Sequence, residues 1–288
     1  MIKKRIVANI VVRNGIVVQS IGFCKYLPVG KPNIAIEFLN QWGIDEIILT
    51  DISATVNSKE PDYESIRQAT KKCFVPLTIA GGINHIDQIK KLMQCGADKI
   101  SLNSAAIKSP TLIIEAAKIF GDQCVIVCID AIKQDDNYKV YEHSTKSVLN
   151  ITVGEWAAKC QELGSGEILI QSVDRDGKYS GFDIEMITSV CERVNIPVTC
   201  SGGARTAADF IEVFEQTNVS GACAANMFHF TEHSVNLTKS IVSKHIPVRL
   251  DTHADYLENS VDADYRIVKK TDQILEKMLY TRIENEII

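Results

Sequence analysis

The chain has 288 residues, of which 45% are hydrophobic and 23% are charged, and its formal net charge is −5. This composition is typical of a soluble globular protein and offers no basic surface for nucleic acid. No apolar run reaches the length of about 20 residues that crosses a membrane. The nine cysteines show neither a CxxC motif nor a Cys/His metal spacing, so we expect reduced thiols, no metal or redox cofactor, and a cytoplasmic location.

The first half of the chain is predicted to alternate between short apolar strands and helices. Residues 5–12 form a continuous apolar strand, and Asn14-Gly15 marks a turn into a short ribbon. Residues 19–31 contain two glycines and a proline and are expected to form a loop long enough to act as a mobile lid. Apolar periodicity, prolines and glycines then predict helices at 32–43, 62–73, 85–95 and 110–120, and strands at 46–52, 75–79, 99–102 and 124–129.

The second half continues this alternation. Residues 133–149 are polar and rich in turn signals, with a small hairpin expected at 138–141. Helices follow at 153–163, 183–194 and 206–216, and strands at 167–170, 197–200 and 221–224.

The last 40 residues or so have a different character. Residues 251–265 are acidic and polar, whereas 266–282 carry a stripe that predicts a helix, made of Ile267, Val268, Ile274, Leu275, Met278 and Leu279. We therefore assign residues 1–249 to one domain and 250–288 to a mostly helical extension. The extension either packs on the domain or contacts another copy or a partner.

Eight strand–helix units in strict alternation predict a parallel sheet closed into a (β/α)8 barrel, the TIM barrel. In this fold the chemistry takes place at the C-terminal ends of the strands. The polar and glycine residues at those ends are Asp51, Gly81, Gly82, Asn103, Asp130, Asp176, Gly177, Gly202, Gly203 and Asn226. Each aspartate could instead cap the helix that follows it, and this alternative remains open.

Two double-glycine turns suggest that the barrel consists of two related halves. Gly81 and Gly202 are 121 residues apart, as are Pro76 and Pro197 in front of them. A glycine lets the backbone approach a ligand and present its N–H groups, so two such turns suit a substrate with a phosphate at each end. The simpler interpretation is that both pairs only make tight turns.

Several stretches closely resemble the HisF family, the cyclase subunit of imidazole glycerol phosphate synthase. They are 45–52 (DEIILTDI), 76–83 (PLTIAGGI), 96–106 (GADKISLNSAA), 174–177 (DRDG), 201–204 (SGGA) and 228–230 (FHF), and the resemblance covers about residues 1–249. It implies that a separate HisH-like glutaminase subunit docks on the bottom of the barrel. Ammonia would then pass through the barrel to an active site at its top.

The resemblance also implies roles for individual residues. The residues that match the family's ammonia gate at the barrel floor are Arg5, Glu46, Lys99 and Glu167. Two residues, Asp98 and Gln123, match positions where the glutaminase docks. The positions that match substrate and phosphate sites are Asp51, Gly82, Asn103, Ser104, Asp176, Gly177, Gly203, Ala225 and Asn226, the last in place of the usual serine. The four gate charges could instead be a static ion network in a closed floor.

The chain departs from the family pattern at its acid–base pair. The fifth-strand aspartate is present as Asp130, but Val11 occupies the first-strand position, where the family has a second aspartate. In the first loop, Lys31 and Gln19 also replace the usual aspartate and lysine. Because losing one member of an acid–base pair typically costs orders of magnitude in rate, we expect reduced or altered catalysis.

Three functions remain in view. The first is a HisF-type subunit that supplies ammonia for amidino groups on surface sugars, together with a HisH-like glutaminase, a phosphorylated or nucleotide-linked substrate and a separate amidotransferase enzyme. The branch with this role resembles the chain at 11–15 (VVRNG). The second is a genuine imidazole glycerol phosphate synthase cyclase in histidine biosynthesis, and the third is a non-catalytic activator or scaffold of the glutaminase.

Overall fold

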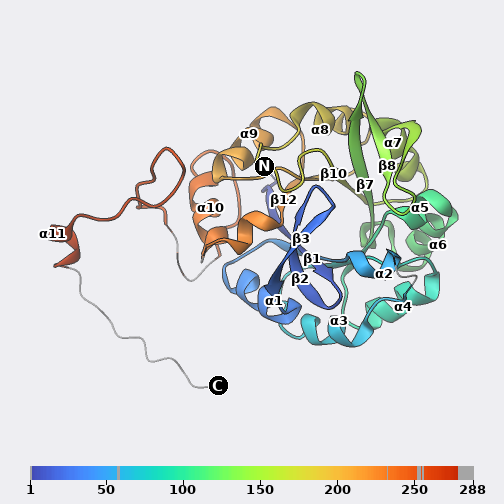
Figure 1. The fold of residues 1–288 in the computed structure, drawn as a ribbon, viewed down its shortest axis with the longest axis horizontal. Coiled ribbons are helices and arrows are strands. Elements are labelled where there is room, and N and C mark those ends of the chain that lie inside the picture. The colour runs from blue at the N-terminus through green and yellow to red at the C-terminus, as the bar shows by residue number, and fades with distance from the viewer. Residues whose placement is uncertain (1, 57–58, 232, 252–253, 255, 278–288) are drawn as a thin grey trace. The chain divides into compact units, whose positions relative to one another are not determined.

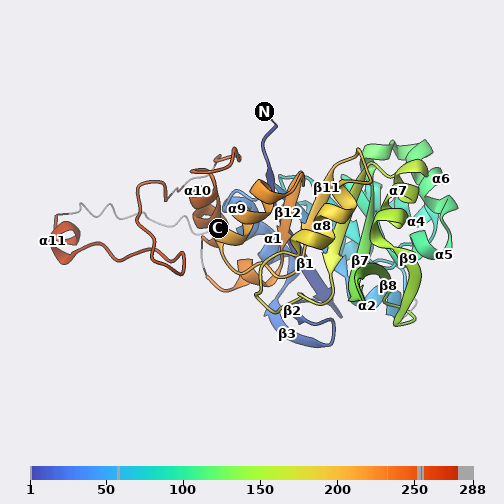
Figure 2. The same cartoon turned by 90° about the horizontal axis from the view of Figure 1, so that it is seen from above.

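The computed structural model describes residues 2–56, 59–231, 233–251, 254 and 256–277, and the chain divides into two units, Met1–Tyr256 and Leu257–Ile288 (Figures 1 and 2). The first unit contains a closed barrel of parallel strands. In their order around the barrel these are β1 (Arg5–Arg13), β4 (Glu46–Asp51), β5 (Leu77–Ala80), β6 (Lys99–Leu102), β7 (Val125–Gln134), β10 (Glu167–Ser172), β11 (Val198–Ser201) and β12 (Gly221–Ala224). Pairing of β7 with β10 and of β12 with β1 closes the ring, so the predicted (β/α)8 barrel is confirmed.

Helices connect the strands and surround the barrel (Figure 1). They are α1 (Pro32–Gln41), α2 (Ile52–Val56), α3 (Tyr63–Thr70), α4 (Ile86–Gln94), α5 (Ser104–Lys108), α6 (Thr111–Phe120), α7 (Val153–Glu162), α8 (Ile184–Cys191), α9 (Ala207–Gln216) and α10 (Ser234–Val242), with short 3-10 helices η1 (Asp122–Cys124) and η2 (Asn226–His229). The start of α7 shows how local sequence sets these bounds, because Thr152 and Glu155 form a capping box. The sequence patterns had not predicted α10.

Two antiparallel hairpins extend the barrel sheet at one end (Figure 2). Strands β2 (Ile16–Ile21) and β3 (Lys25–Gly30) continue from β1, so the loop predicted at 19–31 is wrong. The prediction took Pro28 as a breaker, but β3 pairs only with β2, and proline is tolerated in an edge strand. Strands β8 (Asn137–Glu142) and β9 (Ser147–Thr152) continue from β7 and confirm the hairpin expected near 138–141.

The barrel interior consists of layers of different polarity. Its floor carries charged side chains, which are described below. The layer above is a buried apolar cluster of Val7, Ile48, Ile126, Leu169 and Cys223. Above that layer the walls become polar again, and Thr50 donates a hydrogen bond to Asn9 Oδ1 over 2.8 Å. An apolar layer therefore separates the charged floor from the polar top of the barrel.

The second unit contains little helix in its described part. Helix α11 covers only Asp272–Leu275, and an isolated antiparallel bridge joins Val261 to Ile267. The helix predicted over 266–282 is therefore wrong for its first residues, because Ile267 takes part in the bridge. Met278 and Leu279 of the predicted stripe lie outside the described residues. Within the described ranges, no helix is long and apolar enough to span a membrane.

Candidate active site

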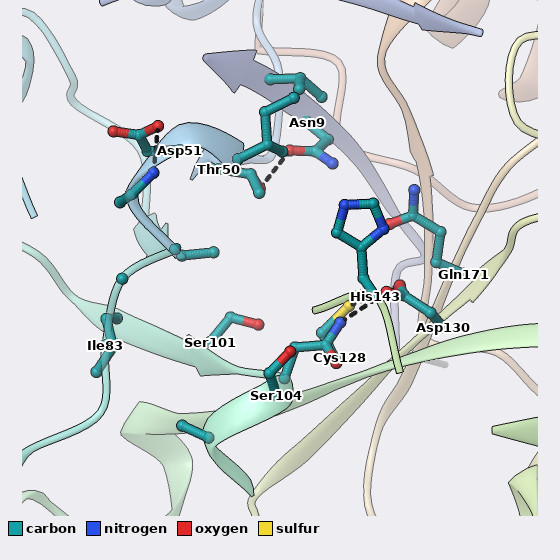
Figure 3. A pocket seen from close by; sticks show the side chains of 18 of the residues that line it. Asn9, Thr50, Asp51, Ile83, Ser101, Ser104, Cys128, Asp130, His143 and Gln171 are labelled. Atoms are coloured by element: carbon teal, nitrogen blue, oxygen red, sulfur yellow. Dashed lines mark hydrogen bonds between the residues drawn. The ribbon is translucent and has the colours of Figure 1, made fainter. Parts of the chain in front are cut away.

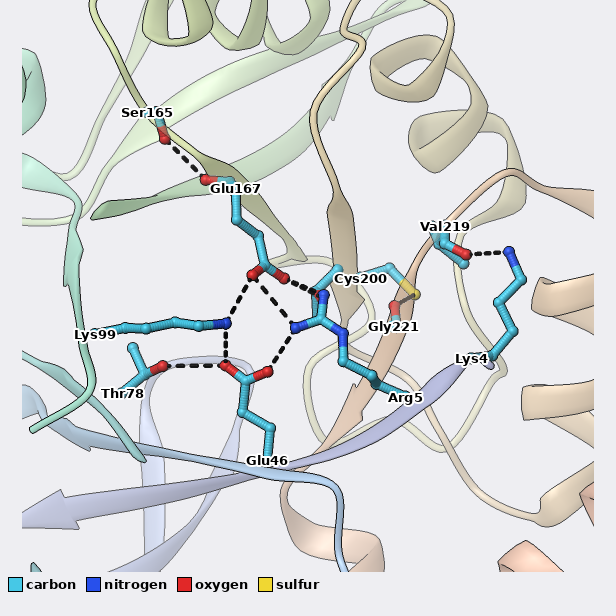
Figure 4. Close-up of polar contacts among 11 residues, drawn as sticks. Lys4, Arg5, Glu46, Thr78, Lys99, Ser165, Glu167, Cys200, Val219 and Gly221 are labelled. Carbon is cyan, nitrogen blue, oxygen red and sulfur yellow. Dashed lines mark hydrogen bonds and ion pairs between the residues drawn. The ribbon is translucent and has the colours of Figure 1, made fainter. Parts of the chain in front are cut away.

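The barrel floor holds a ring of four ionised side chains from four strands (Figure 4). Arg5 contacts Glu46 and Glu167 at 2.5 Å each, and Lys99 contacts the same two carboxylates at 2.9 and 3.1 Å. Both glutamates are buried, and Thr78 and Thr199 donate further hydrogen bonds to them. Each carboxylate is therefore shared by two cations, which compensates for the loss of water around it.

Electrostatics keep this ring charged. Burial works against the charge of Glu167, but the positive charges of Arg5 and Lys99 bring its pKa below the ordinary value. Burial likewise opposes the charge of Lys99, and Glu167 and Glu46 nevertheless raise its pKa. Glu167 and Lys99 therefore remain ionised at neutral pH.

Two adjoining cavities open at the C-terminal ends of the strands. The larger one, of about 310 Å³, is lined by Asp51, Gly82, Asn103, Ser104 and Asp130, and also by Thr50, Ser101, Cys128 and His143 (Figure 3). The smaller one, of about 30 Å³, is lined by Asp176, Gly177, Gly203, Ala225 and Asn226. Asn9, Val11 and Gln171 line both. The structure thus brings the predicted site residues together in two groups on either side of the barrel axis.

The two glycine turns have a steric requirement of their own. Gly81 has φ +99°, and a Cβ placed there would lie 2.0 Å from the Asp51 carbonyl oxygen. Gly203 has φ +98°, and its Cβ would lie 2.1 Å from the carbonyl oxygen of Gly181. Both positions therefore demand glycine for the turn itself, whether or not a ligand approaches.

Asp130 is the buried acid of the larger cavity. Only 5% of the residue is exposed, and its Oδ2 accepts a hydrogen bond of 3.0 Å from the Asn103 side-chain amide. Burial raises the pKa of Asp130 to about 7, although the Asn103 hydrogen bond opposes this rise. This carboxyl group can therefore either donate or accept a proton near neutral pH.

The other two aspartates are engaged in holding the backbone. Asp51 Oδ1 accepts hydrogen bonds from the Ser53 amide at 2.8 Å and the Ser53 hydroxyl at 2.6 Å, so it caps α2. Asp176 accepts hydrogen bonds from the Ser20 hydroxyl at 2.7 Å and the Phe23 amide at 3.2 Å. Asp176 therefore fastens the β2–β3 hairpin over the barrel.

Asn226, the first residue of η2, fastens the same hairpin from another part of the barrel top. Its amide nitrogen donates to the Ser20 carbonyl oxygen at 2.6 Å, while its Oδ1 accepts from the Ser20 amide at 3.2 Å. A serine hydroxyl is too short to make both contacts at once. The Asn226 side chain is therefore bonded to the Ser20 backbone instead of being directed at a ligand.

The remaining predicted residues lie where the sequence placed them. Val11 is 7% exposed and lines both cavities with an aliphatic side chain that cannot transfer a proton. Asp98 and Gln123 are exposed at the N-terminal ends of β6 and β7, on the same side as the charged ring. Among the residues the structure describes, no group of three His, Cys, Asp or Glu side chains could hold a metal ion.

Sequence reasoning missed several residues of the larger cavity. Asn9 lies two residues before Val11 on the same face of β1, so the two-residue period of a strand could have revealed it. His143 reaches the cavity from the turn between β8 and β9, for which the sequence carries no comparable signal.

These features define a (β/α)8-barrel protein that has two adjoining cavities at its top, a buried acid in the larger one, and an ion ring at its floor. Residues 5–234 match the family model described as "Histidine biosynthesis protein". The chain is 40% identical over 263 residues, 91% of its length and 97% of the relative's, to a Vibrio vulnificus (strain YJ016) protein provisionally named imidazole glycerol phosphate synthase subunit hisF2.

Two further relatives carry the name imidazole glycerol phosphate synthase subunit HisF. The one from Streptococcus mutans serotype c (strain ATCC 700610 / UA159) is 39% identical over 246 residues, 85% of this chain and 98% of the relative. The one from Clostridium botulinum (strain Langeland / NCTC 10281 / Type F) is 42% identical over 246 residues, 85% and 97% of the two chains. The chain belongs to the HisF family, as its motifs had indicated.

Proposed function

We propose that this chain is the synthase subunit of a glutamine amidotransferase, which receives ammonia from a HisH-like glutaminase and uses it in the cavity at the top of the barrel. The relatives that carry the name of the HisF subunit support this proposal. The arrangement along the barrel axis supports it as well, since a charged ring, an apolar layer and the cavity that contains Asp130 follow one another from floor to top.

The ring of Arg5, Glu46, Lys99 and Glu167 would act as the gate through which ammonia enters. Burying four charges costs solvation free energy. A floor that only had to be closed could consist of apolar side chains, which do not carry this cost. Lys99 is the best candidate for the moving part, because its flexible stem carries the ammonium group to both glutamates without bidentate contacts. The exposed side chains of Asp98 and Gln123 on the same face would contact the glutaminase.

At the other end of the barrel, a small phosphorylated or nucleotide-linked substrate would span the two cavities. Gly82, Asn103 and Ser104 would hold one phosphate group. The second phosphate would be held by Gly177, Gly203, Ala225 and Asn226, where Asn226 would contribute its backbone because its side chain is bonded to Ser20. Asp130 would transfer protons to and from the reacting atoms.

The acceptor we propose is the precursor of an amidino group in surface-sugar biosynthesis, with a separate amidotransferase enzyme taking part. Val11 is the observation that carries this choice. The cavity contains the buried acid Asp130, but the facing position on β1 has no group that can transfer a proton, so the cyclase reaction would be slow or lost. An intact floor beneath an altered cavity suits a chain that keeps ammonia delivery and changes its chemistry.

The names of the relatives favour a second candidate, the cyclase of histidine biosynthesis, in which Asp130 would suffice with another partner. A third candidate, a non-catalytic activator of the glutaminase, would need neither Asp130 nor the cavities.

The experiment that tests the proposal measures turnover of the phosphoribosyl-formimino histidine-pathway intermediate at saturating ammonium, in the wild type and in Val11→Asp. Val11→Asn is the matched control, because it adds the same bulk without an acid. We expect an inactive wild type, a gain of activity in Val11→Asp, and none in Val11→Asn. A wild type that turns over at an ordinary rate would instead place the chain in histidine biosynthesis.

A further inference from the structure

The larger cavity concentrates buried polar atoms that have no partner. Among the described residues, five buried side-chain atoms lack a hydrogen bond, and three of them belong to residues that line this cavity. These three are Ser101 Oγ, Asn103 Oδ1 and His143 Nδ1. Buried polar groups in proteins are nearly always paired, so three unpaired groups in the wall of one cavity indicate that this wall is not built for stability alone.

His143 is the imidazole of this group, and the structure holds it firmly. It lies in the turn between β8 and β9, and its ring packs edge-on against Phe23 at 5.7 Å and Tyr141 at 6.3 Å between ring centroids. Figure 3 shows the ring projecting into the cavity on the same side as Asp130 and Gln171.

The turn that carries His143 is itself braced. The carboxylate of Glu142 accepts hydrogen bonds from the backbone amides of Ser144 and Thr145, at 3.2 and 2.7 Å. The ammonium group of Lys108 donates to the Ser144 hydroxyl at 2.7 Å and ties the turn to α5. The imidazole is therefore presented from a fixed backbone, as a group that must meet a substrate in one orientation requires.

Most other titratable side chains of the cavity are unsuited to act as a base. Asp51 caps α2, and the Tyr26 hydroxyl donates to a backbone carbonyl at 2.8 Å. Burial raises the pKa of the Cys128 thiol well above its ordinary value, so it stays protonated. Lys59 and Lys108 bring positive charge to the cavity wall. These considerations leave Asp130 and His143 as the groups that can exchange a proton near neutral pH.

We propose that His143 and Asp130 form the acid–base pair of this cavity, with His143 supplying the proton transfer that Val11 cannot. This inference rests on the proposed function in one respect, namely that ammonia is the nucleophile. Ammonia forms a C–N bond with an electrophilic carbonyl or imine carbon of the acceptor, and the new ammonium nitrogen loses one proton to His143. The carbonyl oxygen or imine nitrogen gains the electron pair of the broken π bond and takes a proton from Asp130.

The charged surroundings give the two groups complementary protonation states. Burial lowers the pKa of His143, Lys146 on the same turn lowers it further, and Glu142 opposes both effects. The titratable groups from other parts of the chain that line the same cavity are Tyr26, Asp51, Lys59, Lys108, Cys128 and Asp130. Since burial raises the pKa of Asp130 to about 7, a neutral imidazole and a protonated carboxyl group coexist slightly below neutral pH.

The first test reads the pair directly and needs no acceptor. The proton titration of each ring is followed by NMR of protein labelled with ¹⁵N-histidine, and His143→Gln identifies the His143 signal. The pair requires His143 to lose its proton before Asp130 does, so the His143 midpoint should lie below about 7 and should change little in Asp130→Asn. A His143 midpoint above about 7 would overturn the pair.

The second test measures catalysis without presupposing the acceptor. Small molecules are extracted from a strain of the native host that lacks the gene for this chain. The protein and ¹⁵N-ammonium chloride are added to this extract. Mass spectrometry then measures the ¹⁵N incorporation that depends on the added protein. The pH is varied at a constant concentration of free ammonia. The variant is His143→Gln, and the exposed His245→Gln is its matched control.

The pair predicts a bell-shaped rate profile, which rises on the acid side as His143 loses its proton and falls above about 7 as Asp130 ionises. His143→Gln should lower the rate roughly 100-fold and abolish the acid limb while the fall above neutral pH remains. A variant that is merely slower, with both limbs intact, would make His143 structural and contradict the proposal. If the wild type incorporates no ¹⁵N, the proposed function fails, and the NMR titration still decides whether the pair exists.

Discussion

Asn103 donates its side-chain amide to the carboxyl group of Asp130 over 3.0 Å, from the residue after β6 to the middle of β7. Because a hydrogen bond to a carboxylate favours its charged form, this contact restrains the rise in pKa that burial imposes on Asp130. This hydrogen bond therefore helps to keep the pKa of Asp130 near 7, close to the pH at which the acid would act.

Replacing Asp130 by asparagine should stabilise the protein at alkaline pH. The carboxyl group has a pKa of about 7 in the folded chain and an ordinary value of 3.8, so the folded state retains the proton that the unfolded state releases. Stability is therefore lost as the pH rises from about 4 to about 7, and the loss stays constant above that. Asp130→Asn should raise the free energy of unfolding by on the order of 2–4 kcal/mol at pH 8 and very little at pH 4.

Urea unfolding of both proteins at the two pH values measures this difference. The introduced amide can still accept the hydrogen bond from Asn103, so the comparison isolates the cost of the buried charge. Equal stabilities at pH 8 would mean that Asp130 ionises in the fold without penalty.

Gly81→Ala should destabilise the barrel for a reason independent of any substrate. The added Cβ would lie 2.0 Å from the Asp51 carbonyl oxygen, and the residue has φ +99°. We expect a loss of about 3 kcal/mol or more in the free energy of unfolding. Gly30→Ala is the matched control, because nothing lies within 4 Å of its added Cβ and its φ is not in the left-handed region. Equal effects of the two changes in thermal or urea unfolding would disprove the steric argument.

The sequence could place residues at one end of the barrel wherever that placement depends only on position along a strand. Alternating apolar strands and helices fix a parallel barrel, and a parallel barrel brings Asp130 and both glycine turns to one end. The strand pattern alone could not separate Asp51 and Asp176 from Asp130, since all three come at the C-terminal ends of apolar runs, and only the family resemblance gave Asp130 a different role. Only the contacts with Ser53 and Ser20 show that the first two hold the backbone.

His143 was missed for a different reason. Strand β7 continues past Asp130 to Gln134 before the chain turns, and this extension carries the β8–β9 hairpin back over the cavity. The length by which a strand extends beyond the barrel depends on which strand it pairs with there. The pattern of a single sequence does not show this pairing. The hairpin could be predicted, but the direction of its turn could not.

Asn226→Ser should loosen the β2–β3 hairpin. A serine cannot make both contacts that Asn226 makes with the Ser20 backbone, so at least one buried hydrogen bond is lost, at a cost of about 1–2 kcal/mol. Amide hydrogen exchange should accelerate in residues 16–30, while the β8–β9 hairpin of the same molecule serves as the internal control. Unchanged exchange in residues 16–30 would show that Asp176 alone holds the hairpin.

Lys99→Ala decides whether the floor ring is a gate or a static plug. The change leaves Glu46 and Glu167 paired with Arg5 alone, so stability should fall by about 2–3 kcal/mol, less than for a buried pair that loses its only partner. In the complex with the glutaminase, we expect the ratio of glutamine hydrolysed to product formed to rise at least twofold, because ammonia transfer would no longer be controlled at the floor. Lys118→Ala, on the exposed face of α6, is the matched control and should leave both quantities unchanged. A ratio that stays constant in Lys99→Ala, at a temperature where the variant is fully folded, would identify the ring as a plug and remove its part in ammonia delivery.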